Sequence, residues 1–286
     1  MHYFASFTDR ALAASPIYEG YSKAYKEGAL VDHTSGSVHT GLSVAELAAG
    51  GTLSPHVHSY EESFYVLSGH AIVRVNDRSY RLGPGDCGCL KVGTLHGWRT
   101  VGSIPMRWMQ MAAPQPKPLG AERDTFFKKN AQVPSEARPL DVNDPGGNLL
   151  SHFDVSQIPP GEEGRIVSGG LKGVFLKWLI DEAFGAIHHR LLFIEYLPGV
   201  GIGLHDHTYE EAYFILSGDV EAILDGTRYL AKAGDVLWTG TGCVHAFNNI
   251  GREPVRWLET FSPQPPKENV FRFMAEWEQK ARELEA

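Results

Sequence analysis

A gap-free internal repeat constrains this chain more than any other feature. Four residues of metal-ligand type recur 149 positions further along, since 205 − 56 and 245 − 96 both equal 149. The pairs are His56 and His205, His58 and His207, Glu62 and Glu211, and His96 and His245. The same offset relates Trp108 to Trp257. A repeat of this length predicts two similar domains within the 286 residues.

The repeated residues have the chemistry of metal ligands. Residues i and i+2 of a strand point to the same side, so His56 and His58 would face one interior. Three imidazoles and one carboxylate suit Mn, Fe, Ni, Co, Zn or Cu, and the lack of thiolate ligands argues against a structural zinc site. The sequence therefore predicts two divalent transition-metal ions per chain, whose identity stays open.

Short β-rich runs separated by turn residues fill both copies. Residues 71–75 and 220–224 each have the pattern of a strand, and the tight turns Asn76-Asp77 and Asp225-Gly226 follow them. Many short strands at this spacing are typical of a sandwich or a barrel. Net charge of −8 without a basic run argues against nucleic acid as a partner. Without a leader pattern or an 18-residue apolar span, we expect no membrane partner and a cytoplasmic location.

Both copies resemble the cupin superfamily. Its first motif, G-x5-HxH-x3-E-x6-G, is matched at every fixed position in residues 50–69 and 199–218. Its second motif, G-x5-PxG-x2-H-x3-N, is matched less fully. The proline is replaced by Lys91 and by Gly240, and the final asparagine is kept only as Asn249. These losses affect turn geometry and a strand-end hydrogen bond rather than the metal ligands.

The resemblance implies an all-β chain of two tandem double-stranded β-helix (jelly-roll) cupin barrels with a C-terminal helix. We expect residues 1–116 to form the first barrel with an N-terminal arm, 117–150 a linker, and 151–286 the second barrel with the helix. The helix is predicted from Glu268 to Ala286, with an apolar stripe that packs against a barrel or a partner subunit. The apolar arm is expected to cross the other barrel or a second subunit.

The resemblance also selects the ligands. Counting six residues back from the closing glycine of the first motif selects Glu62 and Glu211, so Glu61 and Glu210 are expected to face outward or to support the turn. One ion would be held by His56, His58, Glu62 and His96, and the other by His205, His207, Glu211 and His245.

Strand alternation predicts an aromatic substrate pocket. Phe64, Trp98, Tyr213 and Phe247 would point inward, whereas Arg99 would point out and leave no cationic anchor for an oxalate-type substrate. Tyr213 occupies the position of Phe64, and a phenol can donate a hydrogen bond or relay a proton. We therefore expect the second site to be the more active.

The leading functional hypothesis is a metal-dependent oxygenase that resembles quercetin-dioxygenase-like bicupins and acts on a small aromatic, enolic or diketone substrate. Glu62 and Glu211 would serve as bases and Tyr213 as a catalytic phenol. Two alternatives stay open: a non-oxidative isomerase, cyclase or lyase, and a non-catalytic bicupin that binds metal or a small molecule. Expected partners are a small-molecule substrate, O2 for an oxygenase, and a possible homo-oligomer. Dependence of turnover on O2 separates the first two hypotheses.

Overall fold

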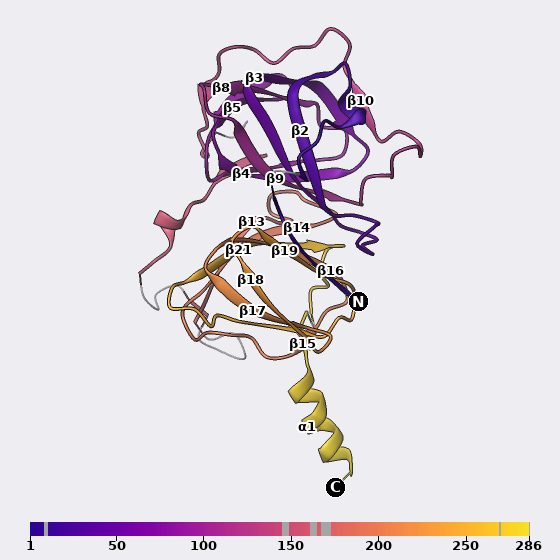
Figure 1. The fold of residues 1–286 in the computed structure, drawn as a ribbon, viewed down its shortest axis with the longest axis vertical. Coiled ribbons are helices and arrows are strands. Elements are labelled where there is room, and N and C mark those ends of the chain that lie inside the picture. Colours follow the sequence, from indigo (N-terminus) through magenta and orange to yellow (C-terminus); the bar gives the residue numbers. More distant parts are fainter. Residues whose placement is uncertain (9–10, 145–148, 161–164, 167–172, 269, 286) are drawn as a thin grey trace.

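The computed structural model describes residues 1–8, 11–144, 149–160, 165–166, 173–268 and 270–285. Two β-barrels lie one above the other along the long axis, and one α-helix extends beyond the second barrel (Figure 1). The predicted all-β architecture of two tandem barrels with a C-terminal helix is confirmed. Within the described residues, no helix is both long and apolar enough to span a membrane.

The first barrel is one sheet that curls on itself around a long bent strand. Residues 41–47 of that strand pair with β9, and residues 52–56 pair with β8, so a single strand belongs to both walls. Its main strands are β2 (Ser22–Val31), β3 (Gly41–His58), β4 (Glu61–Ser68), β5 (His70–Val75), β6 (Arg78–Leu82), β7 (Asp86–Leu90), β8 (His96–Val101) and β9 (Met106–Ala113). A 3-10 turn, η2 (Pro16–Tyr18), precedes β2.

The segment expected as a linker adds further strands to the first barrel. β10 (Thr125–Phe127) pairs with β3, β11 (Arg138–Pro139) with β6, and β12 (Leu150–His152) with β7. A second 3-10 turn, η4 (Val155–Gln157), follows before the chain enters the second barrel. The boundaries at residues 116 and 150 stay a prediction, but much of the chain between them lies on the first barrel.

The second barrel repeats this plan with two separate sheets. Its strands are β13 (Val174–Ile180), β14 (Arg190–Tyr196), β15 (His205–Asp206), β16 (Glu210–Ser217), β17 (Asp219–Leu224), β18 (Thr227–Lys232), β19 (Asp235–Thr239), β20 (His245–Asn248), β21 (Val255–Ser262) and β22 (Arg272–Phe273). β14 and β15 correspond to the two halves of β3. Pro198 lies in the break between them, where a proline cannot donate to a strand ladder.

The N-terminal arm belongs to the second barrel. β1 (His2–Ser6) runs antiparallel to β19, with His2 opposite Thr239 and Ser6 opposite Asp235. In Figure 1 the indigo arm passes from the first barrel down to the second. The expectation that this apolar arm crosses the other barrel is therefore confirmed.

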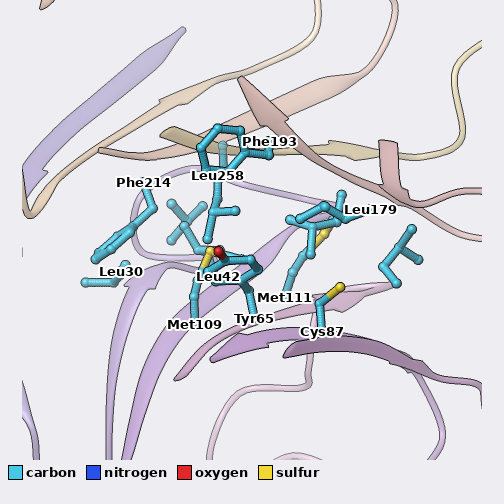
Figure 2. Close-up of a cluster of buried hydrophobic side chains, with 14 of the residues drawn as sticks. Leu30, Leu42, Tyr65, Cys87, Met109, Met111, Leu179, Phe193, Phe214 and Leu258 are labelled. Carbon is cyan, nitrogen blue, oxygen red and sulfur yellow. The ribbon is translucent and has the colours of Figure 1, made fainter. Parts of the chain in front are cut away.

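Each barrel has its own apolar core, and a third core joins them. Figure 2 shows that joint, where Leu42, Tyr65 and Met109 of the first barrel face Phe193 and Leu258 of the second. Cys87 and Cys89 lie in the same cluster as fully buried free thiols. Packed apolar contact of this kind makes the barrels one body rather than two linked domains.

The C-terminal helix differs from the prediction. α1 (Met274–Glu285) begins six residues later than Glu268, and none of its residues is buried. Trp277 is 62% exposed and Leu284 is 78% exposed, so the helical part of the stripe does not pack against a barrel, contrary to the prediction. The first two residues of the stripe, Val270 and Phe273, do pack against the core of the second barrel. Residues 269 and 286 of the predicted range lie outside the described residues. Contact with a partner subunit stays a prediction.

Candidate metal centres

Two clusters of three histidines form where the sequence predicts them. In the first barrel, β3 supplies His56 and His58, and β8 supplies His96, which lies directly opposite His56 in the strand register. One nitrogen from each of the three rings lies within 4.8 Å of the other two, and all three side chains are buried. In the second barrel, His205 of β15 lies opposite His245 of β20, and His207 completes an equivalent cluster.

Neighbouring oxygens fix the orientation of every ring in the first cluster. Nδ1 of His56 lies 2.7 Å from the carbonyl oxygen of Ser54, and Nδ1 of His96 lies 3.0 Å from that of Thr94. Nδ1 of His58 lies 3.0 Å from the hydroxyl of Thr125, on β10. A ring whose Nδ1–H is engaged in this way presents the lone pair of Nε2, which is the arrangement of metal-binding histidines.

The rings of the second cluster are oriented in the same way, by oxygens that lie beside Nδ1. Nδ1 of His205, His207 and His245 lies 2.7, 2.6 and 2.9 Å from the carbonyl oxygens of Gly203, Val270 and Cys243, respectively. We call His58 and His207 the central histidines. Their partners, Thr125 and Val270, come from β10 and from the residues just before β22. We call β10 and β22 the covering strands. The sequence analysis missed these partners because they lie outside both motifs.

The predicted glutamates reach both clusters. Oε2 of Glu62 lies 3.4 Å from Nε2 of His58. In the second barrel, the two carboxylate oxygens of Glu211 lie 3.3 Å from Nε2 of His207 and 3.1 Å from Nε2 of His245. A carboxylate oxygen and an imidazole nitrogen at these distances share either a proton or a metal ion, because a carboxylate oxygen and an imidazole lone pair otherwise repel each other. Each set of three imidazoles and one carboxylate therefore fits a divalent transition metal.

Tyr213 lies at the second centre, as predicted. Its hydroxyl donates to Oε2 of Glu211 at 2.6 Å and lies 3.3 Å from Nε2 of His245. Phe64 occupies the same place in the first barrel and offers no polar atom. The two centres therefore share their ligands but differ in the group beside the carboxylate.

A cavity of about 400 Å³ adjoins the first centre, and Glu62 forms part of its wall. Tyr18 of η2, Glu27 of β2 and Tyr60 also line it, together with Leu42 and the loop around residues 115–119. The ring of Tyr18 makes an edge contact with that of His56 at 5.5 Å between centroids. The sequence analysis missed Tyr18 and Glu27, because residues before the first motif carry no pattern that places them beside the metal ligands.

Comparison with known proteins agrees with this geometry. The cupin domain family model matches residues 43–111 and 192–261, one segment in each barrel. The chain belongs to the cupin superfamily. It is a bicupin, since each barrel carries one complete ligand set.

The bicupin matches two curated proteins over short stretches. It is 32% identical over 74 residues to the polyketide synthase CurC of Streptomyces cyaneus, which is 26% of this chain and 48% of that protein. It is 39% identical over 62 residues to an oxalate-binding protein of Thermotoga maritima, which is 21% of this chain and 51% of that protein. The chain thus spans about half the length of the curated relatives it matches.

Solved structures resemble the bicupin over most of its length. An oxalate decarboxylase of Lactobacillus farciminis superposes with a TM-score of 0.67 at 16% identity, covering 97% of this chain and 90% of that one. Salicylate 1,2-dioxygenase of Pseudoaminobacter salicylatoxidans gives 0.61 at 13% identity, covering 79% and 69%. At these identities the likeness shows a common fold.

Burial and neighbouring charged groups set the protonation of the residues at the two centres. Burial lowers the pKa of His58 to about 3 and that of His96 to about 4, so both rings are neutral at pH 7. Burial also raises the pKa of Glu62. For Glu211 burial acts in the same direction, but His207 and His245 outweigh it and hold the pKa at about 2. The carboxylate of Glu211 therefore takes up a proton less readily than that of Glu62.

Three predicted pocket residues lie in the barrel cores. Phe64 and Trp98 pack edge to face with centroids 4.9 Å apart, and Trp98 stacks on Trp108. Phe247 packs against Tyr213 at 4.6 Å. None of these side chains is among the described residues that line the first-barrel cavity. Their role in binding substrate stays a prediction.

Glu61 and Glu210 do not face outward, which was one of the two expectations for them. Both are buried, at 1% and 3% exposure, because each reaches into the opposite barrel. Glu61 accepts backbone N–H groups of residues 187–188 at 3.0–3.2 Å and lies 2.8 Å from Nδ1 of His189. Glu210 accepts donors from residues 37–40 at 2.6–3.2 Å. These reciprocal anchors lie one residue from the predicted metal ligands Glu62 and Glu211.

Proposed function

We propose that this bicupin is a metal-dependent, dioxygenase-like enzyme that acts on a small aromatic, enolic or diketone substrate. The observation that carries the proposal is the first-barrel cavity, which reaches the ligand Glu62 and has mainly apolar and aromatic walls. Its volume of about 400 Å³ falls within the range of about 300–1,000 Å³ that is usual for small-molecule sites.

The charges of the cavity favour a neutral or weakly acidic substrate over a small dianion. Glu27, Asp32 and Glu62 place three carboxyl groups in its wall, and the described lining contains no arginine. Lys117 lines it too, but its ammonium group lies 2.9 Å from Oε2 of Glu122. A phenol or enol offers an apolar body and one oxygen, which matches these walls better than a dicarboxylate does.

Two carboxyl groups of the cavity have different tasks in the proposed reaction. A bound metal would supply Lewis-acid activation of a substrate oxygen and, with a redox-active ion, access to O2 chemistry. Glu62, beside His58, would accept the proton of a phenol or enol. Burial raises the pKa of Glu27, whose Oε2 accepts a hydrogen bond from the Tyr25 hydroxyl at 2.9 Å. Glu27 is therefore suited to hold a proton at the cavity wall.

The second barrel would use a different acid–base pair. Tyr213 donates to Glu211 beside His245, so this centre has a phenol where the first has only the ring of Phe64. The sequence favours the second centre as the more active, whereas the cavity favours the first barrel for substrate binding. Glu62→Ala and Glu211→Ala, each with its metal content measured, test which centre carries turnover. We expect the larger loss from Glu62→Ala.

A non-oxidative lyase or isomerase is the second candidate. The shared fold with an oxalate decarboxylase over 97% of this chain favours it, and the Bacillus subtilis oxalate decarboxylase, 19% identical, is described with Mn(II) centres. The same ligand set would then act only as a Lewis acid. A metal-loaded binding protein is the remaining alternative, in line with the oxalate-binding relative.

Oxygen consumption separates these functions. Metal-loaded protein is mixed with a panel of catechols, flavonols, β-diketones and oxalate, in air and under nitrogen, while O2 uptake and substrate loss are followed. The proposal predicts stoichiometric O2 uptake with an aromatic or enolic compound. Ala29→Trp, which places a large side chain in the cavity wall without changing a ligand, should abolish turnover but retain metal. Substrate loss at equal rates under nitrogen would establish the lyase, and binding without turnover the binding protein.

A further inference from the structure

A third group of ligand-type side chains lies outside both histidine centres. One nitrogen of His2, one carboxylate oxygen of Asp225 and the sulfur of Cys243 all lie within 4.8 Å of one another. They come from the N-terminal strand, from the turn after β17 and from the loop before β20. Their sequence separation explains why no motif reveals them.

His2 is held in position for a ligand. β1 fixes its backbone against β19, opposite Thr239. Its Nε2 lies 3.0 Å from the hydroxyl of Tyr229, and its Nδ1 faces Oδ2 of Asp225 at 3.4 Å. A metal-binding histidine commonly has its second ring nitrogen fixed by such a partner. The imidazole is thus oriented toward the other two groups before any ion arrives.

The internal repeat shows that the turn does not require an aspartate at position 225 or a cysteine at position 243. At the same positions the first barrel has Asn76 and Thr94. Oδ1 of Asn76 accepts the backbone N–H of Leu95 at 3.3 Å, just as Oδ1 of Asp225 accepts that of Val244 at 3.0 Å. Asparagine thus performs the structural task in the first barrel.

The turn conformation and the neighbouring charge add to this argument. Asp225 has a φ of 47°, in the left-handed region, as Asn76 does at 55°. The turn does not use the second oxygen of Asp225, which lies 2.8 Å from the amino group of Met1 and 3.4 Å from Nδ1 of His2. The thiol of Cys243 is 1% exposed and lies in the same cluster. A buried sulfur, an imidazole and a carboxylate together form a donor set for a thiophilic divalent ion.

We propose that His2, Asp225 and Cys243 form a third metal site, which takes Zn²⁺ or a similar thiophilic divalent ion and ties the N-terminal strand to the second barrel. On binding, the Cys243 thiol gives its proton to solvent as the sulfur–metal bond forms. The site contacts the second histidine centre through one residue, because the carbonyl oxygen of Cys243 accepts Nδ1–H of His245.

Thiolate absorption isolates this site from the other two, because neither histidine centre contains sulfur. The purified protein is titrated with Cd²⁺ and with Co²⁺ while thiolate-to-metal charge-transfer absorption is recorded in the ultraviolet. We expect a band that saturates at one equivalent per chain. Cys87→Ser with Cys89→Ser should retain it, since those thiols lie in the core between the barrels.

The first barrel supplies the matched variants. Cys243→Thr and Asp225→Asn introduce the residues that the repeat carries at these positions, so folding is retained. Cys243→Thr should abolish the band, and Asp225→Asn and His2→Ala should each weaken Cd²⁺ binding about 10-fold or more. Absence of the band in the unaltered protein, or its persistence in Cys243→Thr, would overturn the proposal. A Cd²⁺ affinity in His2→Ala and Asp225→Asn that equals the affinity of the unaltered protein would overturn it too, by showing adventitious binding to one thiol.

Discussion

Replacing Glu210 by alanine should destabilise the joint between the barrels about as much as a large-to-small substitution in its apolar core. The carboxylate is 3% exposed and is the common acceptor for several donors of the first barrel and one of the second. These donors are Ser37 Oγ at 2.6 Å, Val38 N at 2.8 Å, Thr40 N at 3.1 Å, His39 N at 3.2 Å and Trp238 Nε1 at 3.4 Å.

The magnitude follows from the groups that Glu210→Ala leaves without an acceptor. A buried donor deprived of its partner costs about 1–3 kcal/mol. The N–H groups of Val38 and His39 and the indole N–H of Trp238 lose their acceptor, whereas the N–H of Thr40 keeps Ser37 Oγ at 3.0 Å. Water entering the space left by the side chain restores part of this, so we expect the free energy of unfolding to fall by about 3–5 kcal/mol. The midpoint of thermal unfolding should then fall by about 6–20 °C.

Calorimetry of metal-loaded protein measures this loss, with metal content checked because Glu211 is the adjacent residue. Glu210→Gln, which keeps one acceptor oxygen, should lose about half as much free energy. Glu253→Ala, on the exposed surface, serves as the control and should change little. A loss below about 1 kcal/mol for Glu210→Ala would refute the reasoning, since removal of a solvent-exposed carboxylate costs no more than that.

Three further outcomes follow from the metal centres. Protein purified without chelators should hold one ion in each histidine centre, and His58→Ala or His207→Ala should remove one and leave the other, as elemental analysis can show. Tyr213→Phe should retain metal. In the metal-free protein it should raise the pKa of Glu211, measurable by carboxyl infrared bands, because the hydroxyl that stabilises the carboxylate is lost. Metal-free protein should lose stability as pH falls from about 6.5 toward 4. In this range His58 and His96 bind protons in the unfolded state, whereas their lowered pKa values keep them neutral in the folded state. Each imidazole contributes about 2 kcal/mol of this loss at pH 5, and urea unfolding at pH 7 and pH 5 measures it.

The sequence predicted the architecture and the two histidine clusters because the repeat is gap-free where these histidines lie. His56 and His58 had to share a face of one strand, and the repeat supplied the same argument twice. The covering strands could not be found in this way. Thr125 and Val270 do the same task in the two barrels, yet they differ in residue type and their separation is not 149.

Contacts between barrels were also beyond the sequence. Glu61 and Glu210 were expected to face outward because alternation assigns a face but does not say what covers it. Burial of both side chains depends on how one barrel sits on the other. The helix was placed too early for a related reason, since the apolar residues Val270 and Phe273 also fit its stripe. In the structure Phe273 pairs with His205 instead, and the helix begins at Met274.

The covering strands have a consequence for the kinetics of metal exchange. β10 is connected at both ends to chain that lies on the first barrel, whereas β22 leads directly into α1, none of whose residues is buried. Local opening of β22 therefore disturbs less of the fold than local opening of β10. Opening would free Nδ1 of the central histidine and expose that side of the site. The two ions should thus differ in residence time, with a chelator removing the second barrel's ion first.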